Sequence, residues 1–174
     1  MTAFSRYGFS RTKMDDIAKA AGIARTALYR IYRNKEHIFR DLAERVHAGA
    51  LDAAKAELDG QGPFAQRLAD ALVARDLHLL MIGHSGPHAD EIAELYLSLA
   101  GDLAVSYNDA LVDILTVAVD DACQAGQFQL PKAFASSQDF AHLLRLALEG
   151  VKKEVKSADA FEALARQLIA SMSS

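Results

Sequence analysis

Alanine is the residue that most constrains the fold of this chain. The 174 residues include 33 alanines, whereas valine, isoleucine and threonine together number 20. Alanine has the lowest free-energy cost in a helix, and β-branched residues are the ones that strands favour. The three prolines, Pro63, Pro87 and Pro131, each fall where a helical pattern starts or restarts, which helices tolerate. We therefore expect an all-α protein.

Apolar residues at helical spacing divide the chain into about nine helices, and no segment has the alternation of a strand. Thr12 is expected to cap the second helix with its hydroxyl, and Asn34 is expected to cap the fourth. The expected helices cover residues 1–7, 13–21, 25–32, 35–58, 64–82, 88–99, 102–125, 140–155 and 158–172.

Two short helices meet at Gly22 and a third follows them, which is the layout of a helix-turn-helix. Gly22 suits the turn because a side chain would be strained in a left-handed backbone conformation. Ile17, Ala18, Ile23 and Leu28 are expected to form the small core that fixes the angle between the helices. The second of the two short helices is then free to enter the major groove of DNA.

The outer face of this second helix is polar and basic. Arginine donates two hydrogen bonds to guanine, threonine reaches bases or phosphates, and tyrosine reaches phosphates or thymine methyl groups. The start of the following helix, and the threonine that precedes the first of the two short helices, offer sites for phosphate. The predicted DNA contacts are Thr12, Arg25, Thr26, Tyr29, Arg30 and Lys35. An ordinary three-helix corner with a solvated basic face has the same spacing and is the alternative.

The first 50 or so residues contain a longer pattern, Gly8-Phe9-(x)2-Thr12-(x)3-Asp16-Ile17-Ala18-(x)2-Ala21-Gly22-Ile23-(x)4-Leu28-Tyr29-(x)2-Tyr32-(x)2-Lys35-Glu36. This pattern resembles the DNA-binding domain of TetR-family transcriptional regulators, and the rest of the chain resembles them only in helical layout. The resemblance implies a homodimeric repressor that binds a double-stranded DNA operator and responds to a small-molecule effector. It assigns the DNA contacts to the six residues above, and we expect neither a cofactor nor enzymatic activity.

Three features depart from the pattern of the family. Ala24 stands where the family usually has serine at the start of the recognition helix. Thr26 replaces a frequent glycine and Ile31 a frequent aromatic residue, so we expect an altered sequence preference. The first helix of the family normally begins some turns further upstream, and we expect the native chain to have residues before Met1.

Charge is distributed unevenly between two predicted domains, residues 1–47 and 48–174. The first contains ten Lys and Arg against five Asp and Glu, a net charge of +5, and the second has a net charge of −9. The total of −4 taken alone would argue against a nucleic-acid partner. The division instead predicts a basic domain that faces phosphates and an acidic domain that is repelled by them.

The second domain is expected to bind the effector and to dimerise. Ligand pockets are mostly apolar with a few polar groups, and the polar groups predicted here are His78, Tyr96, Tyr107 and Asn108. Each of these is alternatively an ordinary core residue. The last two helices carry apolar stripes that suit a four-helix seam between two copies, at Phe140, Leu144, Leu148, Phe161, Leu164 and Leu168. These residues alternatively pack within their own domain.

Two other function classes compete with the regulator. One is a small-molecule binding module whose basic domain no longer binds DNA. The other is a metal-dependent enzyme, for which His84, His88, Asp90 and Glu91 are the residue types of a metal site. Because a Gly-Pro pair lies between the two histidines and breaks the helix face that would bring them together, we predict no metal there.

The remaining polar features predict no catalytic or cofactor-binding site. Cys123 has no histidine near it in sequence, and no phosphate-binding loop, Gly-x-Ser-x-Gly or dinucleotide motif occurs. Lys152-Lys153-Glu154 is expected to be a solvated helix end. The single cysteine fits a reducing compartment, and no apolar run is long enough to span a membrane, so a cytoplasmic location is expected.

Overall fold

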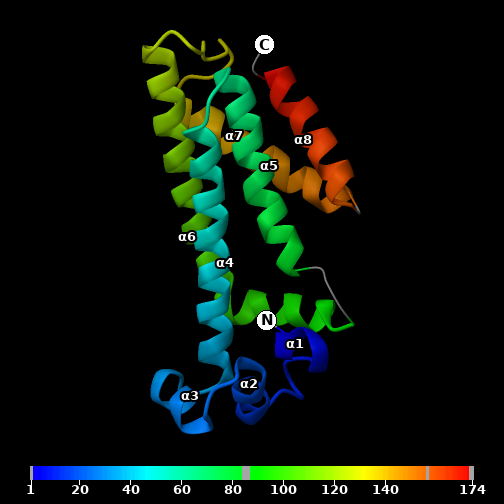
Figure 1. Ribbon diagram of the computed structural model, residues 1–174. Coiled ribbons are helices and arrows are strands. Elements are labelled where there is room, and N and C mark those ends of the chain that lie inside the picture. Colours follow the sequence, from blue (N-terminus) through cyan, green and yellow to red (C-terminus); the bar gives the residue numbers. More distant parts are fainter. Residues whose placement is uncertain (1, 84–86, 156, 173–174) are drawn as a thin grey trace. The chain divides into compact units, whose positions relative to one another are not determined.

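The computed structural model describes residues 2–83, 87–155 and 157–172, which form eight α-helices and no strand (Figure 1). The all-α prediction is therefore confirmed. The helices are α1 (Thr2–Tyr7), α2 (Met14–Ala21), α3 (Arg25–Ile31), α4 (Lys35–Leu58), α5 (Phe64–Gly83), α6 (Ala89–Gln124), α7 (Ser137–Glu154) and α8 (Ala158–Met172). None of the helices in these ranges is both long enough and apolar enough to cross a lipid bilayer.

The helix α6 is continuous where the sequence predicted two helices, 88–99 and 102–125. This break was wrong, and it accounts for the difference between nine expected helices and the eight described. Gly101 lies at the predicted break, but its φ is not positive, unlike that of Gly126 just after the helix. A glycine inside a helix costs about 1 kcal/mol relative to alanine and does not end the helix by itself.

The chain forms two compact units. The first comprises Met1–Ala48 and Leu79–Ala104, and the second comprises Gly49–His78 and Val105–Ser174. We call residues 2–48 of the first unit the head. The first half of α6 packs in the same unit as the head, although it lies far from it in the sequence.

Three phenylalanines from α1, the following loop and α4 form the centre of the first unit. The ring centroids of Phe4, Phe9 and Phe39 lie 5.3 to 5.9 Å apart, two of the three pairs in edge-to-face geometry. Ala18 and Leu28 are buried against this cluster, as the sequence predicted. Ile23 was predicted in the same core but is exposed, because it lies in the turn and on the inward face of neither helix.

The turn between α2 and α3 has the predicted geometry. Gly22 has a φ of +67°, and the N–H of Ile23 donates to the carbonyl oxygen of Ala18 at 3.0 Å. At the start of α4 the side-chain oxygen of Asn34 accepts the N–H of His37 at 2.9 Å, which confirms the predicted cap. These two local signals fix the positions of α3 and of the long helix α4 that follows it.

The predicted cap of α2 was wrong. The residue at the helix boundary is Lys13, whose N–H donates to the carboxylate of Asp16 at 2.9 Å. The hydroxyl of Thr12 instead donates backwards, to the carbonyl oxygen of Gly8 at 2.5 Å. The loop after α1 places Thr12 in the interior, where a backbone carbonyl is its nearest acceptor.

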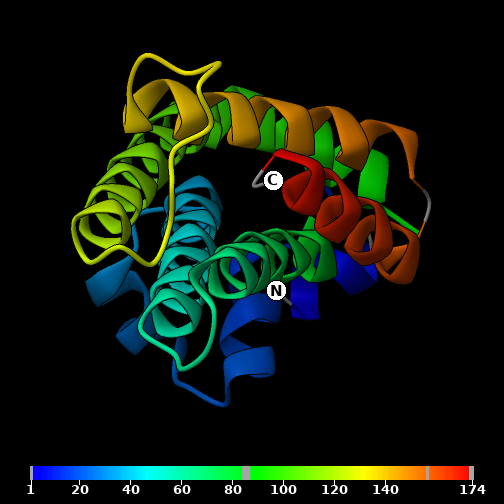
Figure 2. The same ribbon diagram turned by 90° about the horizontal axis from the view of Figure 1, so that it is seen from above.

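The second unit has a core made from the beginning of α5, the second half of α6, and α7 and α8. Helices α7 and α8 lie side by side in both views (Figures 1 and 2). Phe140 at the start of α7 is fully buried, and its ring contacts those of Phe128 and Phe134 from the preceding loop. Ser136 caps α7 by accepting the N–H of Asp139 at 3.1 Å.

Candidate nucleic-acid interface and ligand cavity

The outward face of α3 carries four of the six predicted DNA contacts. Leu28 anchors the inward face of the helix in the aromatic core. The four outward residues Arg25, Thr26, Tyr29 and Arg30 are all exposed. The structure therefore places these four side chains on one solvent-facing side of α3, a helix of seven residues.

Arg25 is oriented by two neighbours within the head. Its Nη1 lies 2.9 Å from the Asp15 carboxylate at the start of α2, and its guanidinium lies 5.4 Å from the centre of the Tyr29 ring. Both partners of the ion pair are exposed, and such pairs contribute about 0–1 kcal/mol. A base or phosphate can therefore replace Asp15 as the partner of Arg25 at little cost.

The other two predicted contacts, Thr12 and Lys35, support the loop between α1 and α2. Thr12 is 1% exposed, and its hydroxyl is already donated to a backbone carbonyl. The Lys35 ammonium donates to the carbonyl oxygens of Phe9, Ser10 and Thr12 at 2.7, 3.3 and 3.3 Å. It also lies 4.3 Å from the centre of the Phe9 ring. Three acceptors use all three of its N–H groups.

Replacing Lys35 with alanine is therefore expected to destabilise the head. The loss is about 1–3 kcal/mol, because the half-buried hydrogen bonds to the carbonyl oxygens of Phe9 and Thr12 lose their charged donor. Thermal unfolding of Lys35→Ala measures it, with Lys19→Ala as the matched exposed control on α2. Equal unfolding temperatures for the two variants would show that Lys35 is free in solution and available to phosphate.

Two polar contacts tie the first half of α6 to the head. The N–H and the hydroxyl of Ser10 both donate to one carboxylate oxygen of Glu91, at 2.7 and 2.6 Å. These hydrogen bonds hold the pKa of Glu91 below its ordinary value. Arg40 of α4 donates to both carboxylate oxygens of Asp102 at 2.7 and 2.5 Å, and its hydrogen bond lowers the pKa of that carboxyl.

Glu91, one of the four candidate metal ligands, thus has a structural contact with Ser10. His88 lies 3.8 Å from the same carboxylate. His84 lies outside the described residues. Within the ranges that the structure describes, no three side chains of metal-ligating type come together.

A buried cluster of charges in the second unit was missed by the sequence analysis. Arg75 and Asp76 of α5 have side chains only 4% and 2% exposed. One oxygen of Asp76 accepts from Arg75 at 2.5 Å and from Lys152 of α7 at 3.2 Å. Arg75 also donates to the side-chain oxygen of Asn108 in α6 at 2.5 Å. The sequence signal was an adjacent Arg-Asp pair inside an apolar stretch of helix.

Lys152 belongs to this charge cluster. The prediction that Lys152 lies at a solvated helix end was therefore wrong. Its side chain is 15% exposed, and its ammonium also lies 2.7 Å from the carboxylate of Glu149. Burial raises the pKa of Glu149, but the hydrogen bond from Lys152 and the attraction of nearby cations together outweigh it, so the pKa of Glu149 is lower than usual. The two cations and two carboxylates balance in charge.

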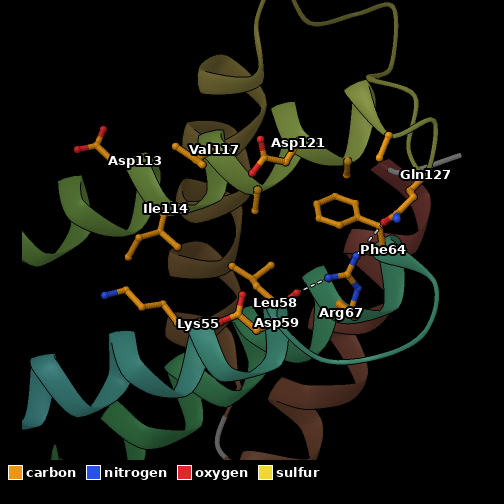
Figure 3. Close-up of a pocket in the computed structure, with 13 residues that line it drawn as sticks. Lys55, Leu58, Asp59, Phe64, Arg67, Asp113, Ile114, Val117, Asp121 and Gln127 are labelled. Carbon is orange, nitrogen blue, oxygen red and sulfur yellow. Dashed lines mark hydrogen bonds between the residues drawn. The ribbon is translucent and has the colours of Figure 1, made fainter.

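A cavity of about 660 Å³ lies in the second unit (Figure 3). The end of α4, the start of α5 and the second half of α6 surround it. Leu58, Phe64, Ile114, Val117, Ala118 and Ala122 supply its apolar lining, and Lys55, Asp59, Arg67, Asp113, Asp121 and Gln127 supply its polar groups. The volume is within the range of small-molecule sites.

Arg67 fixes one wall of the cavity. It donates through Nη1 to the carbonyl oxygen of Leu58 at the end of α4, and through Nη2 to the side chain of Gln127 at 3.0 Å (Figure 3). A cation at the C-terminal end of a helix is favourable because the helix dipole is negative there. Arg67 therefore joins α4 to the loop after α6.

Residues 1–42 match the family model of the bacterial regulatory proteins of the tetR family. Over these residues the chain is similar to the DNA-binding region of that family. The match covers α1 to α3 and the start of α4, which are the helices that carry the exposed basic face. It agrees with the resemblance seen in the sequence.

Solved structures resemble the chain over nearly its whole length. PfmR, a TetR family transcriptional regulator from Thermus thermophilus, has 17% identity and a TM-score of 0.60, with 99% of this chain and 93% of that chain covered. The SmeT–triclosan complex has 18% identity and a TM-score of 0.65, with 98% and 85% covered. A protein of unknown function from Rhodococcus sp. RHA1 has 16% identity and a TM-score of 0.51, with 99% and 91% covered. These likenesses establish the TetR-type fold for the chain.

The four polar residues predicted for the effector pocket of this TetR-type fold lie in different surroundings. Tyr96 is in the first unit, with its hydroxyl 2.5 Å from Nε2 of His47. Asn108 accepts from Arg75, and His78 packs so close to Gly49 that an added Cβ there would lie 3.0 Å from Nε2. Tyr107 is partly buried on α6. None of the four lines the 660 Å³ cavity, and their role in binding an effector stays a prediction.

The residues predicted for a TetR-type dimer seam divide into two groups. Phe140, Leu144, Leu148 and Phe161 are at most 1% exposed and belong to the core of their own unit. Leu164 is exposed and Leu168 is half-buried. The exposed leucines of α7 are Leu143, which was predicted as part of the apolar stripe of that helix, and Leu146, which was not. The helical period places Leu143 at the edge of the buried stripe and Leu146 on the opposite face.

Proposed function

We propose that the protein is a homodimeric transcriptional regulator that binds operator DNA through α3 and is released by a small-molecule effector in the second unit. The observation that carries this proposal is the outward face of α3, where Arg25, Thr26, Tyr29 and Arg30 are exposed above an aromatic core. Such a face has the donors that read base edges in the major groove.

Dimerisation is part of the proposal because two operator half-sites require two reading heads. Leu143 and Leu146 of α7 and Leu164 of α8 are 44%, 45% and 45% exposed, on neighbouring helices. Leucines on two adjacent helices favour a four-helix seam with a second copy.

Release by the effector requires that it binds one spacing of the two heads more tightly than the other. An effector with equal affinity for both spacings would shift nothing, however tightly it binds. In the repressing state the two heads are spaced to fit the operator, and the effector stabilises the other spacing.

Arg25 tests the proposal. Arg25→Ala is expected to weaken operator binding by about 1–3 kcal/mol and to relax selectivity at one base pair. Arg25→Lys keeps the charge but loses the two-donor geometry, so it should lose selectivity while keeping the salt dependence of binding. Fluorescence anisotropy with DNA flanking the protein's own gene, and with single-base variants, measures both. Unchanged affinity and selectivity in Arg25→Ala would reject this docking of α3.

A small-molecule binding module without a DNA partner is the second candidate. Thr12 and Lys35 donate their hydrogen bonds to carbonyl oxygens within the head, so two of the six predicted DNA contacts have no free donor. This observation favours the second candidate. A folded wild-type dimer that shifts no fragment of its flanking DNA at low salt would support this candidate over the regulator.

A further inference from the structure

Asp15 places a carboxylate next to the exposed basic face of α3. It lies in the first turn of α2, and its Oδ2 accepts from Nη1 of Arg25 at 2.9 Å, across the turn at Gly22. The neighbouring Asp16 has a different role, because its carboxylate accepts the N–H of Lys13 at the start of α2. A negative charge on a surface that faces DNA phosphates opposes binding, so a carboxylate here is unfavourable unless it contributes to recognition.

The guanidinium of Arg25 is contacted by two side chains of the head. Tyr29 lies one helical turn further along α3, and the centre of its ring is 5.4 Å from the guanidinium carbon. Asp15 contacts the same guanidinium through Nη1. The charged end of a long, flexible side chain is therefore restrained by a carboxylate and by an aromatic ring.

The other edge of this guanidinium is open to a ligand. Arginine has five N–H groups, and the contact with Asp15 uses one of them. No other acceptor in the described ranges contacts Arg25, and 62% of its side chain is exposed. The N–H groups of Nε and Nη2 lie side by side on this edge. They match the two acceptors of guanine in the major groove, N7 and O6, while Nη1 keeps its contact with Asp15.

We propose that Asp15 is a positioning residue that makes Arg25 selective for guanine, which rests on the proposed binding of operator DNA by α3. Breaking the exposed ion pair costs little by itself. A phosphate that takes Nη1, however, leaves the Asp15 carboxylate beside a second negative charge, whereas guanine has neutral acceptors and leaves the pair intact. Asp15 thus lowers the affinity of the head for DNA of any sequence and raises its preference for one G·C pair.

Base preference, measured with and without the carboxylate, tests the proposal. Wild type and Asp15→Asn each select duplexes from a random DNA library, and fluorescence anisotropy compares the selected duplex with its single-base variants. We expect Asp15→Asn to lower discrimination at one G·C pair about three- to tenfold, the range expected for ordering one long side chain. Its affinity for unselected duplexes should be equal or higher. Unchanged discrimination, or a loss of affinity that is equal for all duplexes, would overturn the proposal.

A double variant distinguishes positioning from direct readout of a base. Because Asp15 is proposed to act through Arg25, adding Asp15→Asn to Arg25→Ala should change no base preference further. A carboxylate that itself accepts from N4 of a cytosine would act without Arg25. Base preference that falls further in the double variant than in Arg25→Ala alone would therefore reject the positioning role.

Matched variants test the contribution of the ring and of charge alone. Tyr29→Phe keeps the aromatic ring beside Arg25 and should discriminate at the G·C pair as the wild type does, whereas Tyr29→Leu should lose discrimination about as far as Asp15→Asn. Glu44→Gln removes an exposed carboxylate from α4 of the head and should leave base preference unchanged. An equal loss of discrimination in Glu44→Gln would show a general effect of charge and reject the role of Asp15.

The inference and the proposed regulator fail in different ways in this experiment. A wild type that selects no sequence from the library rejects the regulator, and with it this role of Asp15. A wild type that selects a sequence but discriminates at every base pair no better than Asp15→Asn rejects the inference alone.

Discussion

Replacing Asp76 with alanine is expected to lower the free energy of unfolding by about 3–5 kcal/mol. The substitution leaves the Arg75 guanidinium and the Lys152 ammonium buried without the carboxylate that both contact. An uncompensated buried charge costs far more than the loss of a surface ion pair, which contributes about 0–1 kcal/mol. Chemical denaturation of Asp76→Ala, followed by helical circular dichroism, measures the loss.

Asp109→Ala provides the control, since it removes an exposed carboxylate from a helix of the same unit. It is expected to change stability by less than about 0.5 kcal/mol. A triple variant, Arg75→Met with Asp76→Leu and Lys152→Met, removes the three charges together and should be more stable than Asp76→Ala. If Asp76→Ala loses under about 1 kcal/mol, water reaches the charge cluster in solution and the burial described for it is incorrect.

Local signals in the sequence predicted the helices because helix formation depends mainly on neighbouring residues. Alanine content and apolar period indicated the all-α class, and Gly22 and Asn34 marked the turn and the cap seen in the structure. Gly101 misled because glycine ends a helix only where the backbone turns left-handed or a proline follows. Gly101 is the same residue type as the glycines that end helices in this chain, but its φ is not positive.

The roles of side chains were harder to predict, since they depend on distant partners. Thr12 and Lys35 have residue types that suit phosphate contacts, but carbonyls of the loop after α1 accept their hydrogen bonds. Lys152 resembled a solvated helix end until Asp76, 76 residues away in sequence, was placed beside it. The cavity likewise combines residues from three helices, and no spacing within one helix reveals it.

The double variant Leu143→Glu with Leu164→Glu is expected to convert the proposed dimer into a monomer. Both leucines are exposed on α7 and α8, and a four-helix seam between two copies would bury them. Burying two carboxylates per copy without partners opposes association strongly. Light scattering after size-exclusion chromatography measures the mass, and anisotropy measures operator binding. Affinity should fall at least 100-fold, because one protein no longer joins two half-site contacts.

Leu97→Glu separates this effect from a general effect of an added charge. Leu97 is 74% exposed but lies on α6, outside the proposed seam, so the variant should remain dimeric and bind DNA. Phe140→Ala separates the seam from the core: Phe140 is fully buried in its own unit, so its loss should lower stability by about 3–5 kcal/mol without producing a folded monomer. A dimer that survives both glutamates would show that these exposed leucines do not form the interface, and the seam would have to lie on another face.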